Sequence, residues 1–546
     1  MSSLLRALSP IFLKRSKLRL MLRGYARLRK QGRINLLRRI KSDISVTQLG
    51  GGSESLSPLF FGASAEKSMV VVRQYLIDRH AGAGLNRAIL LALGRDSKLV
   101  YPLPKVWLKV LVDHGLNVCF IRSSLAWMCV LFVYFVRNIV RVSGFLIKSF
   151  LVKRQVMPLK PYAYFNGLSA VNLPNLDPSA PSYDVCSWYA KWSGRISHVE
   201  IIRHDVVGHP VTSVGGMRVE NIKLPPYLLL VGLGRVSALV VWSVVTMVLS
   251  GMALICGRWC YAVLLLEAVR SKAVALTSQE FLADDYLFHH SGSAYRPMWT
   301  YEAEKKGSRV ACYFYSTSEQ PKLPHGYETQ KFEWAALSWP IYLVWDKYQE
   351  ELLRRNMNDK PNVLIVGPIF FSTSAQKFYI PPNSVAVFDS EPHRLAFHFP
   401  NSTLGDYLVA HPDLNARFLQ DVHTVLRETR LNMVLKRKRE IGSRTRKSYL
   451  RAFRKVAGEG GVVVLPSSLS PALVIEHSLG VISMPFTSTA LMMPASVVPS
   501  IYYDPTGWIS VDDEAAHGVP IIVGIDALRQ WVRDTIKPLG TRGHEC

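Results

Sequence analysis

Three consecutive hydroxyl residues, Thr487, Ser488 and Thr489, stand in the sequence VISMPFTSTALMM (481–493). The apolar run before them is typical of a buried strand, and the apolar stretch after them has helical spacing. Hydroxyl donors between a strand and a helix N-terminus form a phosphate site, because the first backbone N–H groups of the helix point the same way. An ordinary helix N-cap is the alternative interpretation of the same three residues.

Polar residues also follow the neighbouring predicted strands. Because the carboxyl ends of parallel strands meet at one edge of a sheet, we expect these residues to gather there. Cations and hydroxyls at such an edge favour the diphosphate of a nucleotide-sugar. We predict phosphate contacts from Thr487, Ser488, Thr489, Lys436, Lys438, Ser467 and Ser468, and nucleotide or sugar contacts from Asp504, Thr506, Gly507 and Gly367.

The elements that must position these residues show an alternating rhythm. From about residue 360 onward, β-rich runs such as NVLIVGPIFF (362–371), NSVAVFDSEP (383–392) and GVVVLPSS (461–468) alternate with helical stretches. This βαβα order predicts an open parallel sheet of the Rossmann-like type. The chain has no GxGxxG fingerprint, which disfavours a dinucleotide-dependent dehydrogenase.

At the hydroxyl triplet the chain resembles a family of bacterial polysaccharide-biosynthesis proteins named for a PFTS motif. The signature is MPFTSTA (484–490), and it lies between LKRKRE (435–440) and YYDPTGWI (502–509), in the order that the family shows. Upstream segments, among them WPIYLVWD (339–346) and VAVFDSEP (385–392), are also similar. The resemblance covers roughly residues 280–535. It implies sugar transferases of surface-glycan loci with a GT-B-like fold.

We therefore expect an α/β, GT-B-like chain in which two Rossmann-like domains face a cleft. Residues 1–75 would be a basic amphipathic segment and linker. Residues 76–335 would form the acceptor-side domain, with an apolar membrane-associating insertion at 225–269. Residues 336–546 would form the nucleotide-donor domain.

A general base for the acceptor hydroxyl would come from the N-terminal half, across the cleft from the phosphate loop. The first candidates are Asp284, Asp285 and Glu302, followed by His289, His290, Asp205 and His209. For each of them a structural role is the alternative. We expect neither a metal nor a cofactor, because protein cations and helix dipoles can neutralise a leaving nucleotide phosphate.

Charge and hydropathy indicate a membrane surface as a partner. The net charge is +26, and residues 1–42 hold thirteen Lys or Arg and no acid. Such a segment favours an amphipathic helix on anionic lipid, with a solvated tail or a nucleic-acid contact as alternatives. The uncharged run 236–256 is long enough to span a bilayer, unless it is a buried core helix, whereas 123–136 is too short before Arg137.

Together these features predict a glycosyltransferase at the cytoplasmic face of the inner membrane, attached peripherally or monotopically. It would transfer a sugar from a nucleotide-sugar donor to a growing surface polysaccharide. The acceptor would be a glycan or lipid-linked, and nucleic acid would not be a partner. Two alternatives remain open: a CDP-polyol-type phosphotransferase, and a non-catalytic membrane assembly protein.

Overall fold

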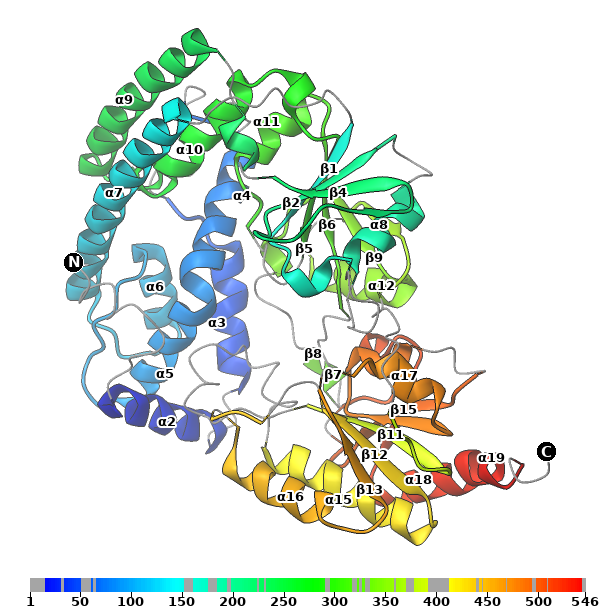
Figure 1. Ribbon diagram of the computed structural model, residues 1–546. Helices are drawn as coiled ribbons and strands as arrows, with labels where there is room; N and C mark the ends of the chain where they lie inside the picture. The colour runs from blue at the N-terminus through cyan, green and yellow to red at the C-terminus, as the bar shows by residue number, and fades with distance from the viewer. Residues whose placement is uncertain are drawn as a thin grey trace.

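The structure is a computed structural model (Figure 1). It describes residues 15–30, 34–50, 60–61, 65–151, 161–174, 184–193, 198–222, 225–229, 232–289, 295–316, 322–323, 327–328, 334–357, 360–369, 378–390, 412–437, 441–443, 445–467, 469–492, 497–507 and 509–542.

The first sheet has eight strands in the order β10-β9-β6-β5-β1-β2-β4-β3, and all neighbours pair in parallel except β3 and β4. Counted from β1, and leaving aside the edge strand β3, the order is that of a doubly wound sheet: it grows outward through β2 and β4, then restarts at β5 on the other side of β1. The strands are β1 (Tyr162–Asn166), β2 (Ile201–His204), β3 (Thr212–Val214), β4 (Met217–Asn221), β5 (Asp285–His289), β6 (Arg309–Tyr313), β9 (Ile341–Val344) and β10 (Val363–Ile365).

The second sheet has six parallel strands in the order β13-β12-β11-β14-β15-β16, which is the Rossmann order 3-2-1-4-5-6. A two-stranded ribbon, β7 (Lys322–Leu323) with β8 (Tyr327–Glu328), is separate from both sheets. The six strands are β11 (Ser384–Asp389), β12 (Asn432–Arg437), β13 (Val462–Leu465), β14 (Gly480–Ser483), β15 (Ser500–Asp504) and β16 (Ile521–Val523).

Helices flank both sheets and build a separate helical part at the N-terminal side (Figure 1). With the first sheet go α8 (Val185–Ser193), α11 (Trp299–Lys305) and α12 (Lys347–Asn356); with the second go α15 (Pro412–Glu428), α16 (Lys447–Ala457), α17 (Pro471–Glu476), α18 (Ile525–Trp531) and α19 (Lys537–Arg542). The helical part consists of α2 (Arg15–Lys30), α3 (Ile34–Val46), α4 (Ala65–Leu76), α5 (Asn86–Gly94), α6 (Lys105–Asp113), α7 (Phe120–Leu151), α9 (Leu233–Ile255) and α10 (Cys260–Leu276).

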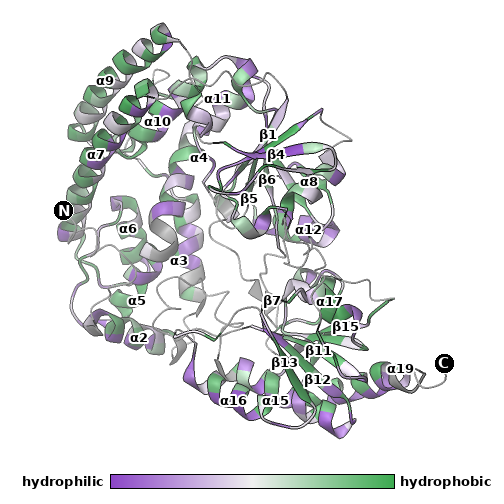
Figure 2. Ribbon diagram, viewed as in Figure 1, coloured by the Kyte–Doolittle hydropathy of each residue, from purple (hydrophilic) through white to green (hydrophobic). Residues whose placement is uncertain are grey.

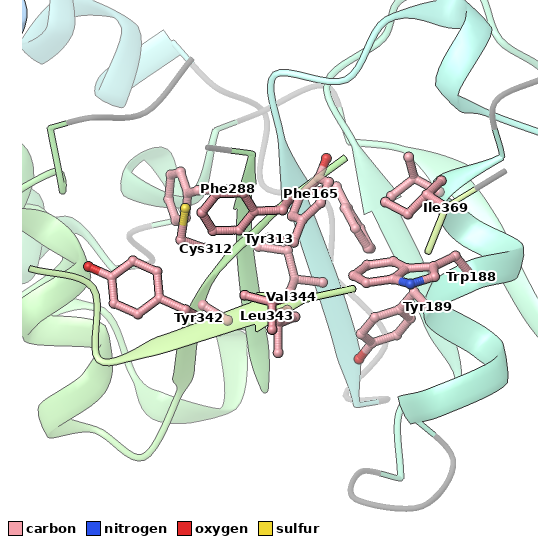
Figure 3. Close-up of a cluster of buried hydrophobic side chains, with 14 of the residues drawn as sticks. Phe165, Trp188, Tyr189, Phe288, Cys312, Tyr313, Tyr342, Leu343, Val344 and Ile369 are labelled. Atoms are coloured by element: carbon pink, nitrogen blue, oxygen red, sulfur yellow. The ribbon is translucent and has the colours of Figure 1, made fainter. Parts of the chain in front are cut away.

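The core of the first unit is aromatic (Figure 3). Strand residue Phe165 meets Tyr189 of α8 edge-to-face, with ring centroids 5.4 Å apart, and Trp188 packs near Tyr313 of β6 at 5.6 Å. These rings are buried on both the sheet and the helix side, as a parallel sheet covered by helices requires. Ile369, which follows β10, belongs to the same cluster.

The two units meet at the carboxyl edges of their sheets. Asp346, which follows β9, accepts a hydrogen bond from the ring of His517, with 2.8 Å between the carboxylate oxygen and Nδ1. Arg355 of α12 forms an ion pair with Glu514, in the same segment after β15. Asp346 follows the carboxyl end of β9, and the segment with Glu514 and His517 follows that of β15, so the two carboxyl edges face one another. The predicted GT-B-like fold of two facing α/β units is confirmed.

The first unit extends further along the chain than predicted. β9 and β10 lie beyond residue 335 and pair with the first sheet. The segment 362–371, which the sequence assigned to the C-terminal sheet, therefore supplies the edge strand of the first one. An apolar run indicates that a strand forms, but it does not encode which of two sheets receives it. In the structure Leu364 and Ile365 of β10 are exposed at the sheet edge, so the expected buried strand is a correction as well.

The basic N-terminal segment is part of the fold where the structure describes it. Met21 and Leu28 of α2 and Ile40 of α3 are buried in one hydrophobic cluster with α5 and α6. α2 crosses α5 so closely that a Cβ on Gly94 would lie 1.9 Å from the Leu20 carbonyl oxygen. The predicted separate lipid-bound segment is therefore wrong for α2 and α3, because their apolar faces pack against protein.

The apolar segments form two long helices. α9 and α10 occupy the predicted insertion 225–269, with α10 buried and α9 largely exposed. α7 is a continuous helix of 32 residues. The apolar segment 123–136 is therefore part of a longer helix than the sequence indicated. By length and composition alone, α7 and α9 could each cross a membrane.

We predict that Gly94→Ala destabilises the protein by forcing α2 and α5 apart where they cross. The added methyl must displace backbone, and such overpacking costs about 1–3 kcal/mol. The melting temperature should fall. Gly234→Ala is the matched control, because no atom lies within 4 Å of its added Cβ, and Ala favours a helix over Gly by up to about 1 kcal/mol. Equal melting temperatures for the two variants would contradict the close crossing.

Candidate functional site

A cavity of about 750 Å³ opens where the order of the first sheet reverses. β1 and β5 flank that point, and Tyr164, Asn166 and Phe288 from these strands line the cavity. The loop after β2 adds Asp205 and His209. Ligands of open α/β sheets bind in this crevice, outside the carboxyl ends of the strands.

Asp205 is the carboxylate in this cavity that is available for proton transfer. Its side chain is exposed, and it forms no hydrogen bond or ion pair with any residue that the structure describes. It lies close enough to act on neighbouring groups: burial lowers the pKa of His289, and the charge of Asp205 partly offsets that effect. A carboxylate without a partner, facing a cavity, can accept a proton from a bound hydroxyl.

The two histidines beside Asp205 are engaged with the fold. His204 is fully buried and its Nδ1 accepts the backbone N–H of Val206 at 3.2 Å. Burial, and then the charge of His209, lower the pKa of His204 to about 4. The ring nitrogens of His209 lie 2.9 and 3.1 Å from two backbone carbonyl oxygens. Both rings therefore shape the loop that carries Asp205.

The three carboxylates predicted as catalytic lie elsewhere. Asp284 and Asp285 stand at the start of β5, at the sheet edge opposite the cavity. Asp285 is buried and accepts two hydrogen bonds from Arg309, at 2.7 and 2.6 Å. Glu302 pairs with Lys305 on α11 at 2.9 Å. Their positions do not support the predicted catalytic role, and His290 is outside the described residues.

The hydroxyl triplet follows β14 at the switch point of the second sheet, where β11 and β14 adjoin. Thr487 Oγ1 donates to the Met484 carbonyl at 2.8 Å, and Thr489 Oγ1 lies 3.1 Å from Ser483 Oγ. Ser488 is half-buried, and its hydroxyl has no partner among the described residues. Phe486 holds this turn with a φ of +62°.

The expected helix N-terminus is absent at this turn. Residues Ser488–Leu491 form a four-residue 3-10 turn, and Thr487 makes no side-chain capping hydrogen bond. The helix dipole therefore adds nothing here, and the alternative of an ordinary N-cap fails as well. Of the three hydroxyls, those of Thr487 and Thr489 are hydrogen-bonded, and that of Ser488 has no hydrogen-bond partner among the described residues.

The turn lies where the two units meet. Phe486 and Ala490, on either side of the triplet, belong to the same buried cluster as Phe165 and Trp188 of the first unit. The Tyr502 hydroxyl of β15 also donates to the Thr487 carbonyl at 2.9 Å, which ties the turn to the neighbouring strand. The hydroxyls are therefore held at the junction of the units.

The other predicted donor residues have different positions. Lys436 is buried near the end of β12, and Ser467 follows β13, both on the expected edge; Lys438 and Ser468 lie outside the described residues. Asp504 is buried and accepts hydrogen bonds from Thr506 and from the backbone N–H of Ile509.

Asp504 and Thr506 thus stabilise their own loop. Gly507 in that loop has a φ of +70°, and an added Cβ would lie 3.2 Å from Val523. Gly367 is a correction: it follows β10 of the first sheet, and its carbonyl accepts the indole N–H of Trp188 at 3.1 Å. It therefore lies outside the unit predicted to bind the nucleotide.

Sequence reasoning did not single out the arginines around the cavity. Arg79 and Arg270 line it together with Glu267, and Glu267 lies 2.9 Å from Arg270. These residues come from the helical part, far from any strand end. For Arg270 the only signal in the sequence is charge inside a largely apolar helix; Arg79 stands among polar residues and has no such signal.

Two doubly wound sheets with facing carboxyl edges, one carrying a free carboxylate and the other a hydroxyl turn, define a GT-B-like protein. The profile of the family described as "Polysaccharide biosynthesis PFTS motif protein" matches residues 242–532, more than half of the chain. The chain belongs to this family, and the resemblance noted at MPFTSTA is confirmed.

Solved structures were also compared. A UGT transferase from Siraitia grosvenorii in complex with UDP is 11% identical, with a TM-score of 0.32, over 71% of this chain and 94% of that one. MurG from Acinetobacter baumannii is 10% identical, with a TM-score of 0.30, over 70% and 92%. The fold of this chain is defined by its own strand order and register. No curated protein matches the chain.

We predict a pH dependence of stability from His204. Its pKa is 6.5 when unfolded and about 4 when folded, so below pH 6.5 the unfolded chain binds a proton that the folded chain does not. Stability is therefore lost as the pH falls from 6.5 towards 4, by up to about 3 kcal/mol at about 1.4 kcal/mol per pKa unit.

In His204→Asn this contribution should disappear. The melting temperature of the variant, measured at pH 7 and at pH 4.5, should fall by less between the two values than that of the wild type. Parallel pH profiles for the two proteins would show that His204 is not the group that titrates.

Proposed function

We propose that the protein is a membrane-associated glycosyltransferase, which transfers a sugar from a nucleotide-activated donor to a growing surface polysaccharide. One observation carries this proposal. Asp205 and the hydroxyl turn 487–489 stand at the switch points of two doubly wound sheets whose carboxyl edges face one another. These two positions support an acceptor-side base on the first sheet and a donor-side phosphate site on the second.

In the proposed reaction Asp205 takes the proton from an acceptor hydroxyl as that oxygen attacks the anomeric carbon of the donor sugar. The bond from this carbon to the nucleotide phosphate oxygen breaks, and negative charge grows on the leaving phosphate. Ser488 donates a hydrogen bond to it, and Lys436 at the neighbouring strand end supplies positive charge. Thr487 and Thr489 hold the turn through their bonds to Met484 and Ser483.

Attachment to a membrane is supported by α7 and α9. They pack on α10 along one side of the molecule, and both are apolar over much of their length (Figure 2). Only 28% of the most apolar stretch of each helix is buried. Exposed apolar area of this extent is rare on soluble monomers and typical of membrane contacts. Nucleotide-sugars are made in the cytosol, so we assign the cytoplasmic face.

Asp205→Asn should remove the base without changing the shape of the loop. We expect kcat to fall by about 100-fold or more, while the KM for the donor stays within about twofold, because the donor contacts lie on the other sheet. The measurement is nucleotide release by the purified full-length protein, given a panel of UDP-, GDP- and CMP-activated sugars with a glycan or lipid acceptor.

Asp284→Asn is the matched control for that experiment. Asp284 is also exposed, yet it lies at the opposite edge of the same sheet, so its loss should leave kcat nearly unchanged. A large loss of kcat in Asp284→Asn, with none in Asp205→Asn, would show that the base is Asp284, as the sequence predicted. Transfer of phosphorus to the acceptor, instead of sugar, would identify a phosphotransferase.

Ser488→Ala should lower kcat by about 100-fold, because one preorganised donor to the leaving phosphate is lost. Its melting temperature should hardly change, since the hydroxyl has no protein partner among the described residues. Thr487→Val is the comparison: it loses the 2.8 Å bond to Met484 and should lower the melting temperature instead. Full activity in Ser488→Ala would end the phosphate assignment.

A further inference from the structure

A second cavity, of about 940 Å³, is lined by helices of the helical part and by residues of the segment 225–228, which follows β4. Its walls carry five cations, Arg79, Arg137, Arg141, Lys148 and Arg270, against a single carboxylate, Glu267. A surplus of guanidinium groups around a cavity disfavours the empty state, because like charges repel, and favours an anion with several oxygens.

Most of these cations have no counter-charge of their own. Arg270 is paired with Glu267 at 2.9 Å, and Arg79 lies 3.1 Å from Asp78. Arg137, Arg141 and Lys148 form no ion pair with any residue that the structure describes. The Arg270 Nε is buried without a hydrogen-bond partner among the same residues. Donor capacity is therefore left over for a ligand.

The position of the cations on α7 relates the cavity to a lipid surface. Arg137, Arg141 and Lys148 recur at intervals of four and seven residues, so they share one helix face. One residue earlier at each step stand Val136, Val140 and Ile147, and the last two are 63% and 59% exposed. A basic stripe beside an exposed apolar stripe is the pattern of a helix at the level of lipid headgroups.

The second cavity adjoins the cavity of the candidate active site. It shares Arg79, Tyr227, Glu267 and Arg270 with the cavity that contains Asp205. The Arg270 guanidinium lies 4.6 Å from the centre of the Tyr227 ring, at this shared wall. A group held by the cations of α7 would therefore have its next chemical unit directed towards Asp205.

We propose that this cavity binds the phosphate or diphosphate of a lipid-linked acceptor, with the lipid chain along α7 and α9 and the attached sugar reaching the Asp205 cavity. This assignment rests on the proposed function, since it names the acceptor of that reaction. A diphosphate suits the three unpaired cations of α7 because it carries two to three negative charges. The apolar stripe beside them distinguishes a lipid-borne phosphate from a soluble one.

Vesicle flotation of the full-length protein tests the assignment without turnover. Phosphatidylcholine vesicles carrying a few per cent of a long-chain isoprenyl diphosphate are compared with vesicles carrying equal charge as phosphatidylglycerol. We expect tighter binding to the first kind, and a loss of at least about tenfold of that binding in Arg137→Gln/Arg141→Gln, since hydrogen bonds to charged groups are lost. Inorganic pyrophosphate should compete only weakly.

Arg122→Gln is the matched control, because Arg122 is an exposed cation of the same helix that does not line the cavity. It should change isoprenyl diphosphate binding by less than about twofold, as one rim charge does. Arg141→Lys should restore part of the binding, and unchanged melting temperatures show that the variants are folded.

Three results would overturn the assignment: equal binding to both vesicle types, equal losses in Arg122→Gln and the double variant, or full competition by inorganic pyrophosphate. The first two indicate a general anionic surface, and the third a site for a free phosphate. Binding as expected, together with no nucleotide release from any donor, would overturn the proposed function and leave the lipid site standing.

Discussion

All strands of a parallel sheet end on the same edge, and in this protein two such edges are held face to face. The contact that fixes them is between Asp346, after β9, and His517, after β15. Burial alone would raise the pKa of Asp346, but the hydrogen bond and charge of His517, with two backbone N–H groups, outweigh burial and lower it. The carboxylate therefore stays ionised at the junction, and the facing edges carry Asp205 on the first sheet and the hydroxyl turn on the second.

The helical part indicates how the junction would be oriented relative to a membrane. α7 and α9 present apolar side chains outward, whereas the cations of α7 line the cavity that adjoins the Asp205 cavity. A membrane on the apolar side would thus lie next to the acceptor half of the site and away from the second sheet. The donor half would then stay open to water, which suits a soluble nucleotide-sugar and a lipid-borne acceptor.

The second sheet could be predicted from the sequence because its strands are short apolar runs, each followed by a polar loop. The family resemblance implied a second Rossmann-like domain, but the strands of the first sheet were not located from the sequence, since they come from residues as far apart as 162 and 365. The length of α7 could not be predicted, because Arg137 and Arg141 interrupt the apolar run. The sequence alone does not show whether such a charge ends a helix or faces a cavity from within it. The burial of Met21 and Leu28 depends on a partner helix that charge patterning does not show.

The candidate site was predicted on the donor side more closely than on the acceptor side. The position of Ser488 after a strand is a local property, so it could be inferred, although the helix expected after it is a 3-10 turn. The choice among acidic residues is not local. Asp205 and Asp284 differ only in which end of a strand they adjoin, and that depends on where the strands of the first sheet begin and end.

The most direct test of the proposed site is a structure of the full-length protein with a nucleotide-sugar bound. We expect the diphosphate within hydrogen-bonding distance of Ser488 Oγ, at the switch point of the second sheet, with the sugar directed across the junction towards Asp205. A nucleotide bound in the cavity of the first sheet, or at the amino edge beside Asp284, would contradict it.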